Sequence, residues 1–267
     1  MTDLGYGRLA KQAAPRIFVT LAAPTLAAME ALAGRVVGVP VGYELRLDYL
    51  HDFTDFQSQL HQMLVRMHFP QVIATCRREV AGGMMKGTVE EQIAILASAA
   101  RAGCQWIDVE FETVRKAGSS VLREFRPTKL MVSHHDYRRT PPLSGTYRQL
   151  ARLPVQAIKV ATHARELRDN LKIRRLLKAH RRRAPKLVAL AMGPSGIPSR
   201  VLGLLWGSAL TYASPGNHSG VVPGQVPAEV MRATYRVDRC FSSKSYDPPT
   251  PSKPEVIVAK WRSVTLG

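Results

Sequence analysis

The sequence predicts an α/β fold, specifically an eightfold β/α (TIM) barrel. Eight apolar segments of strand length occur along the 267 residues, and segments with helical periodicity separate most of them. Strands that alternate with helices form a parallel sheet. The segments lie about 25 to 35 residues apart, which matches the repeat of a barrel of about 250 residues.

We expect strands at Ile17–Leu21, Val41–Leu47, Val72–Thr75, Trp106–Val109, Leu130–Ser133, Ala157–Val160, Leu187–Met192 and Ala209–Tyr212. The competing architecture, a doubly wound sheet, requires a glycine-rich nucleotide-binding turn after its first strand. The segment LAAPTLAA (residues 21–28) contains no glycine, which favours the barrel.

The clearest predicted helix covers residues 88–103. Thr88 is a candidate N-cap, Glu91 completes a capping box, and Gly103 suits a C-cap. Its apolar stripe consists of Ile93, Leu96, Ala97 and Ala100. A second periodic segment covers residues 164–182, and its apolar face consists of Leu167, Leu171, Ile173, Leu176 and Leu177. The interval before the eighth strand is shorter, so we expect a small seventh helix.

We expect one barrel domain over residues 16–239, between an N-terminal extension (1–15) and a C-terminal tail rich in Pro and Ser (240–267). Residues 16–34 imitate a signal peptide, but Pro24 and Glu30 interrupt their apolar core, so we expect a strand and a helix there. No run of about 18 uninterrupted apolar residues occurs in the sequence, so no transmembrane helix is expected.

The chain is strongly basic, with 38 Lys and Arg against 20 Asp and Glu, and its net charge is +18. This charge favours nucleic acid, an anionic membrane or an acidic small substrate as partners, and a solvated basic surface has the same composition. The three cysteines, Cys76, Cys104 and Cys240, form no CxxC pair. Their odd number argues against a disulfide framework or a cysteine zinc site and indicates a reducing compartment.

Polar residues collect where the predicted strands end, which is the catalytic face of a β/α barrel. In chain order they are Glu44, Arg46, Asp48, Arg77, Asp108, Glu110, His134, His135, Lys159 and Arg200. Strand alternation points His134 and His135 to opposite faces, so at most one of them faces a shared site. Each residue alone is more often a structural ion-pair or hydrogen-bond partner. Together they indicate carbonyl chemistry, because a pocket lysine is a candidate Schiff-base nucleophile and arginines bind a carboxylate.

The ordered motifs resemble those of the type I 3-dehydroquinate dehydratases of the shikimate pathway. The matching motifs are ELRLD (44–48), TCR with GG (75–83), IDVE (107–110), SHHDYRRTP (133–141), IKVA (158–161), MGPSGIPSR (192–200), GSALTYA (207–213) and PGQ (223–225). The resemblance runs from about Arg16 to about Arg239. It implies a cytoplasmic enzyme that dehydrates 3-dehydroquinate to 3-dehydroshikimate, and homodimers occur in the family.

The resemblance also implies roles for the site residues. Lys159 forms a Schiff base with the C3 carbonyl of the substrate, and His135 removes the C2 hydrogen and then protonates the departing C1 hydroxyl. Asp108 is expected to orient His135, while Arg200 and Gln225 are expected to bind the substrate carboxylate. The remaining substrate-binding residues are Glu44, Arg46 and Arg77. Because the lysine supplies the electron sink, neither a metal nor a cofactor is implied.

Two positions depart from the family pattern. Ala81 stands where the family usually has Glu, and Glu79 lies two residues earlier. Val221 stands four residues before Gln225, where the family often has Ser or Thr, and Ser219 is close by. We expect an active but slow enzyme.

Two other functions stay open on the sequence. A different lysine-dependent barrel lyase or aldolase also uses Lys159, but it does not need MGPSGIPSR and PGQ together. A catalytically impaired barrel with a basic surface that binds nucleic acid or an acidic partner is supported by KIRRLLKAHRRRAPK (172–186). That segment has no interleaved aromatic residues for base stacking, so nucleic acid is a poor fit and a solvated helix face explains it equally well.

Overall fold

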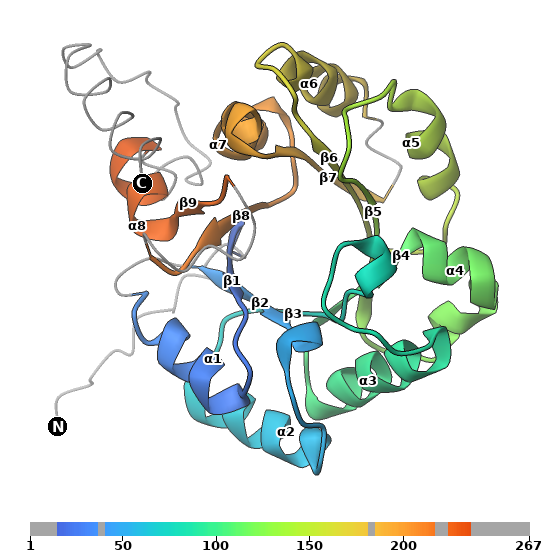
Figure 1. Ribbon diagram of the computed structural model, residues 1–267, viewed down its shortest axis with the longest axis vertical. Coiled ribbons are helices and arrows are strands. Elements are labelled where there is room, and N and C mark those ends of the chain that lie inside the picture. The colour runs from blue at the N-terminus through green and yellow to red at the C-terminus, as the bar shows by residue number, and fades with distance from the viewer. Residues whose placement is uncertain (1–14, 37–40, 181–184, 217–223, 236–267) are drawn as a thin grey trace, which may run out of the picture.

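The computed structural model describes residues 15–36, 41–180, 185–216 and 224–235. Within these ranges a parallel sheet curls into a ring, and helices cover its outside (Figure 1). The strands are β1 (Ile17–Leu21), β2 (Gly42–Arg46), β3 (Val72–Thr75), β4 (Trp106–Glu110), β5 (Lys129–Asp136), β6 (Ala157–His163), β7 (Lys186–Met192), β8 (Thr211–Ser214) and β9 (Val226–Pro227). The helices are α1 (Leu26–Ala33), α2 (Phe56–Met67), α3 (Val89–Ala102), α4 (Phe111–Ala117), α5 (Ser144–Leu150), α6 (Asp169–Ala179), α7 (Ile197–Trp206) and α8 (Ala228–Tyr235).

The strand order is β7-β6-β5-β4-β3-β2-β1-β8-β9, and every ladder is parallel. Among the described strands no ladder joins β7 to β8, but Ala209 N donates a hydrogen bond to Leu187 O at 2.8 Å beside that seam. The predicted β/α barrel is therefore confirmed as a curled parallel sheet with helices on its outside (Figure 1). Of the predicted flanking segments, residues 1–14 and the tail 240–267 lie outside the described residues.

All eight predicted strands are present, but some bounds differ. β5 and β6 run further than expected because their polar ends stay in the ladder, where Asp136 pairs with Thr162 and His163 pairs with Met192. β8 begins two residues later than predicted, at Thr211. The carbonyl groups just before it are bound by side chains instead, since Arg16 donates to Ala209 O at 3.1 Å.

The helix predictions hold for α3 and need correction for α6. Residues 164–168 are not helical, because Asp169 Oδ2 accepts a hydrogen bond from Arg165 N at 3.0 Å just before the helix begins. Leu167 and Leu171 are 68% and 47% exposed, so they do not belong to the buried face. That face consists of Ile173, Leu176 and Leu177. The expectation of a small seventh helix is also wrong, since α7 follows a short 3-10 turn and has 10 residues.

Two buried apolar clusters support the barrel. The larger cluster lies between the sheet and the helices and includes Val19 of β1 and Leu96 of α3. The smaller cluster lies inside the ring and includes Phe18, Met131 and Tyr212. Alternation along each strand separates the two clusters, so the interior of the ring is packed rather than hollow. No helix among the described residues is long and apolar enough to cross a membrane.

The capping box of α3 gives a stability prediction. Thr88 Oγ1 accepts a hydrogen bond from Glu91 N at 3.2 Å, and Glu91 Oε2 accepts one from Thr88 N at 2.7 Å. Replacing Thr88 by Ala is expected to lower the free energy of unfolding by about 1 kcal/mol, because the N-cap acceptor is lost. Urea unfolding measures this change. Thr88→Ser keeps the hydroxyl and serves as the control, and equal stability of the two variants would contradict the prediction.

Candidate active site

The predicted site residues gather around one cavity of about 130 Å³ at the carboxyl ends of the strands. Seven of the eight predicted residues line it, namely Glu44, Arg46, Arg77, His135, Lys159, Arg200 and Gln225. They come from β2, the segment after β3, β5, β6, α7 and the segment before β9, so only the curled arrangement of the sheet brings them together. Asp108, the eighth residue, lies beside the cavity and contacts Lys159.

Lys159 projects from β6 into this cavity and is 5% exposed. Its Nζ lies 3.0 Å from Asp108 Oδ2 and 3.4 Å from Glu44 Oε1. On another side, Nζ lies 4.1 Å from the centre of the Tyr212 ring. Two carboxylates and an aromatic face therefore surround the amine, and all three stabilise a positive charge on that nitrogen.

Glu44 is a buried carboxylate that contacts two hydroxyl groups and the Lys159 amine. Its oxygens accept hydrogen bonds from Thr20 Oγ1 at 2.9 Å and Thr75 Oγ1 at 3.0 Å. Burial opposes ionisation, but the charges of Lys159, Arg46 and Arg77 prevail and lower the pKa of Glu44 to about 2. Glu44 is therefore ionised at neutral pH. The two threonines were not among the predicted site residues, although strand alternation already placed Thr20 and Thr75 on the inward face at the ends of the first and third strands.

His135 faces the cavity and His134 faces away, as the alternation of a strand predicted. His135 Nδ1 lies 2.8 Å from Arg77 Nη1, and the His135 ring stacks on Tyr137 with centroids 5.8 Å apart. His134 Nδ1 instead pairs with Glu112 Oε1 at 2.8 Å. Burial, followed by the positive charges of Arg77 and Lys159, lowers the pKa of His135 well below 6.5. His135 is therefore neutral at pH 7.

The contact with Arg77 fixes the tautomer of His135. A guanidinium group only donates hydrogen bonds, so His135 Nδ1 must accept, and the hydrogen of the neutral ring lies on Nε2. In this arrangement neither ring nitrogen has a free lone pair. His135 becomes a base only when Arg77 releases Nδ1.

Any orienting effect of Asp108 on His135 is transmitted through Arg77 in this structure. Asp108 Oδ2 contacts Lys159 Nζ and, at 3.4 Å, Arg77 Nη2, so Arg77 lies between Asp108 and His135. The register explains the distance between the two, because Asp108 pairs with Met131, four residues before His135 on β5. Asp108 therefore lies deeper in the barrel than the imidazole.

Arg200 and Gln225 present unpaired polar atoms to the cavity. Arg200 is 2% exposed, and its Nε has no hydrogen-bond partner among the described residues. Burial lowers the pKa of Arg200 to about 10, so it remains charged at neutral pH. Gln225 Nε2 donates to Thr20 Oγ1 at 2.9 Å, while Gln225 Oε1 has no partner among the described residues. The buried unpaired donor of Arg200 suits an anionic ligand, whereas Gln225 Oε1 is an acceptor and suits a hydroxyl group.

Of the two positions that depart from the family pattern, the structure describes Ala81 but not Val221. Ala81 ends a short 3-10 turn (Glu79–Ala81), and Glu79 is exposed on that turn, so Glu79 does not replace the missing carboxylate. Gly82 follows with φ of +74°, and a Cβ atom there would lie 2.4 Å from the Tyr137 ring. The backbone next to Ala81 thus packs against the aromatic ring that covers His135. Val221 and Ser219 lie outside the described residues.

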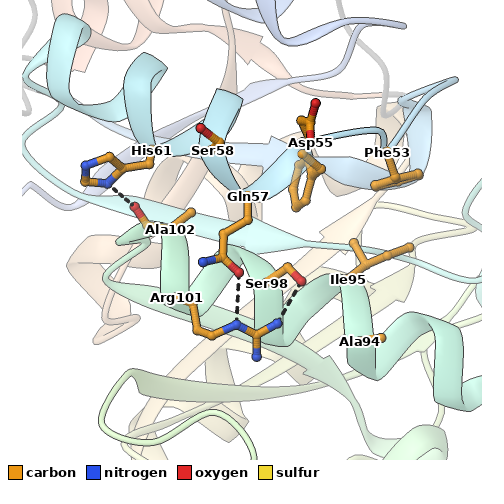
Figure 2. Close-up of a pocket in the computed structure, with 11 residues that line it drawn as sticks. Phe53, Asp55, Gln57, Ser58, His61, Ala94, Ile95, Ser98, Arg101 and Ala102 are labelled. Atoms are coloured by element: carbon orange, nitrogen blue, oxygen red, sulfur yellow. Dashed lines mark hydrogen bonds between the residues drawn. The ribbon is translucent and has the colours of Figure 1, made fainter.

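A larger hollow of about 670 Å³ lies on the outside of the barrel between α2 and α3 (Figure 2). None of the predicted site residues lines it. Its polar groups are largely satisfied, since Arg101 donates to Gln57 Oε1 at 2.9 Å and to Ser98 Oγ at 3.0 Å (Figure 2). The cavity around Lys159 is smaller than this hollow, but it contains the predicted site residues and is therefore the better candidate for the active site.

The lowered pKa of His135 gives a pH prediction. The acidic limb of kcat/KM is expected below pH 6.5, because protonation of the buried imidazole is unfavourable in the folded state. Between pH 6.5 and that limb, the unfolded chain binds a proton that the folded chain does not, so stability also falls as the pH falls. Arg77→Gln removes one positive charge, so the limb should move to higher pH. Arg77→Lys keeps the charge, so the acidic limb of kcat/KM should stay at low pH. Equal pH profiles for both variants would contradict the assignment of this limb to His135.

Comparisons with known proteins show the family of this chain. Residues 17–241 match the family described as type I 3-dehydroquinase. A 3-dehydroquinate dehydratase from Dehalococcoides mccartyi is 36% identical over 198 residues, which cover 73% of this chain and 84% of that protein. One from Syntrophobacter fumaroxidans is 34% identical over 203 residues, with 73% and 85% covered. The crystal structure of the 3-dehydroquinate dehydratase from Geobacillus kaustophilus superposes with a TM-score of 0.76 at 23% identity, over 85% of this chain and 92% of that one. This chain belongs to the type I 3-dehydroquinase family.

Proposed function

We propose that this protein dehydrates 3-dehydroquinate to 3-dehydroshikimate and water, in the shikimate pathway, through a Schiff base on Lys159. The observation that carries the proposal is the buried amine of Lys159, which shares one small cavity with His135 and the unpaired guanidinium of Arg200. The family and its relatives supply the reaction and the substrate.

In the first step, the Lys159 ammonium gives up a proton and Nζ attacks the C3 carbonyl. The carbonyl oxygen takes up this proton and a second one from Nζ and leaves as water, and a protonated iminium ion remains. The iminium nitrogen carries a positive charge next to Asp108, Glu44 and the Tyr212 ring. These groups hold the charge in the same place before and after condensation, so little reorganisation is required. The iminium withdraws electrons from C2 and makes the C2 hydrogen acidic.

In the second step, His135 takes the C2 proton and an enamine forms. Substrate oxygens that bind Arg77 draw its guanidinium away from His135 Nδ1, and the freed lone pair can then accept a proton. The protonated imidazole next donates to the C1 hydroxyl, which leaves as water when the enamine expels it. Hydrolysis of the imine returns Lys159 and releases the product.

The remaining residues hold the substrate. Arg200 binds its carboxylate, because Arg200 Nε is a buried donor with no partner among the described residues. Gln225 lies nearby, and its unpaired Oε1 can accept a hydrogen bond from a substrate hydroxyl. Arg46 is held by Asp48 through two hydrogen bonds, at 2.9 and 2.7 Å, so its guanidinium is fixed before substrate arrives. Arg46 and Glu44 bind the ring hydroxyls.

Ala81 is expected to limit the rate. A Glu at this position, as in the family, would add a carboxylate next to Gly82, which packs against the Tyr137 ring beside His135. Such a carboxylate can attract the Arg77 guanidinium away from His135 Nδ1 and free its lone pair. Ala81→Glu is therefore expected to raise kcat about tenfold, because the lone pair of His135 Nδ1 is no longer occupied by the hydrogen bond from Arg77. Steady-state kinetics measure the change, and Ala81→Gln controls for side-chain volume. Unchanged turnover in Ala81→Glu would show that this departure is tolerated.

A borohydride trap tests the proposed function. The protein is incubated with 3-dehydroquinate, reduced with borohydride and digested, and the modified peptide is identified by mass spectrometry. An adduct on Lys159 together with formation of 3-dehydroshikimate is expected. Absence of both in a folded sample would favour the alternative, a catalytically impaired barrel that binds an acidic partner.

We propose a cytoplasmic location, because Cys76 and Cys104 are free and buried, as is common in reducing compartments. Nucleic acid is not proposed as a partner. A homodimer is the expected assembly, and light scattering tests it.

A further inference from the structure

A second cavity, of about 520 Å³, lies at the end of the barrel opposite Lys159. The first residues of four neighbouring strands line it, namely Trp106 of β4, Lys129 of β5, Ala157 of β6 and Lys186 of β7. This is the amino-terminal mouth of the barrel. Its volume falls within the range of small-molecule sites, which is about 300 to 1,000 Å³.

Strand alternation and register turn these four residues toward the barrel axis. Ala157 and Lys159 are two residues apart on β6, so both side chains point to the same face of the sheet. Ala157 pairs with Lys186 on β7 and with Met131 on β5, and Lys129 precedes Met131 by two residues. Lys129 in turn pairs with Trp106. The inward direction of the catalytic lysine therefore fixes an inward direction for both mouth lysines.

The floor of this cavity is apolar and separates it from the active site. Phe18, Met131 and Val188 form the floor, and each is at most 1% exposed. Beyond Met131 lies Tyr212, whose hydroxyl donates to Met131 Sδ at 3.7 Å and whose ring faces Lys159. The small side chain of Ala157 leaves the space above the floor open. A ligand in this cavity would bury its apolar surface without reaching the catalytic groups.

The rim of the cavity is positively charged. Lys129 and Lys186 are both exposed, and neither has a carboxylate within ion-pair distance among the described residues. No Asp or Glu of the described chain lines the cavity. Lys129 Nζ lies 5.6 Å from the centre of the Trp106 ring. Two unpaired ammonium groups above an apolar floor complement a molecule with an apolar body and an anionic group.

We propose that the amino-terminal mouth of the barrel is a second binding site, which takes a small aromatic anion. The apolar body of the ligand contacts Trp106, Ala209 and Leu210, which line the cavity and are partly exposed, and its carboxylate or sulfonate pairs with Lys129 and Lys186. The site is separate from the proposed catalytic function and does not depend on it.

Fluorescence titration with anilinonaphthalenesulfonate tests the proposal, with the neutral probe N-phenylnaphthylamine as its partner. The full-length protein is expected to bind the sulfonate with one-to-one stoichiometry. The double variant Lys129→Gln/Lys186→Gln should weaken sulfonate binding about tenfold, since two charge contacts are lost. Binding of the neutral probe should change less than the binding of the sulfonate.

Two control variants locate the binding. Lys116→Gln/Lys178→Gln removes the same charge from exposed positions of α4 and α6 and should leave the affinity unchanged. Arg200→Gln removes a cation from the catalytic cavity and should also leave it unchanged. Equal affinity in the mouth variant and the wild type would overturn the proposal. Loss of binding in Arg200→Gln would place the probe in the catalytic cavity and would overturn it as well.

Discussion

Replacing Lys159 by Met is expected to abolish the borohydride-trapped adduct and to lower kcat at least about a thousandfold, because no other amine can form the iminium. Among the described residues, no second lysine lines the catalytic cavity. Mass spectrometry of the trapped protein and steady-state kinetics measure the two effects. Lys178→Met, on the exposed face of α6, is the matched control and should behave as the wild type.

Lys159→Met is also expected to lower the free energy of unfolding, and this effect must be distinguished from the loss of kcat. Lys159 pairs with two buried carboxylates, those of Asp108 and Glu44. Removal of the amine leaves them without this partner, and breaking a buried ion pair costs about 3 to 5 kcal/mol. Circular dichroism and urea unfolding of Lys159→Met are therefore part of the experiment. A folded Lys159→Met protein that retains turnover would contradict the Schiff-base mechanism.

Replacing His135 by Gln is expected to lower kcat about 100- to 10,000-fold while the trapped adduct persists. The adduct should form because Lys159 is intact, whereas removal of the C2 proton and protonation of the C1 hydroxyl both lose their side chain. Quantitative peptide mapping after borohydride treatment, together with kcat, distinguishes these steps.

His134→Gln is a matched control next to it in the chain. His134 points away from the cavity and pairs with Glu112, so its loss should change kcat little. If His134→Gln loses as much activity as His135→Gln, the proposal that His135 and not His134 is the catalytic base is contradicted. Absence of the adduct in His135→Gln would instead place His135 in the condensation step.

Much of the fold and most of the site could be predicted from the sequence by itself. The eight strands were predictable because inner strands of a parallel sheet are buried on both faces and show as short apolar runs. α3 was predictable because its capping box and C-cap glycine are local signals. The two-residue period of a strand showed that at most one of His134 and His135 faces the site, and the resemblance to the family then selected His135. Six of the seven predicted residues that line the cavity could be collected because the carboxyl ends of barrel strands meet at one face, and the seventh, Gln225, came from the family resemblance.

Other features were decided only by the tertiary structure. The sequence could not place Asp108 relative to His135, because their relative height depends on the register between β4 and β5. It could not show that Arg77 donates to His135 Nδ1, since that contact joins residues 58 positions apart. The start of α6 at Asp169 depends on a side-chain hydrogen bond to Arg165 that periodicity does not encode. Local patterns along the chain determined the elements and their inward faces, whereas the tautomer of His135, its pKa and the amino-terminal cavity depend on contacts between strands that only the curled sheet brings together.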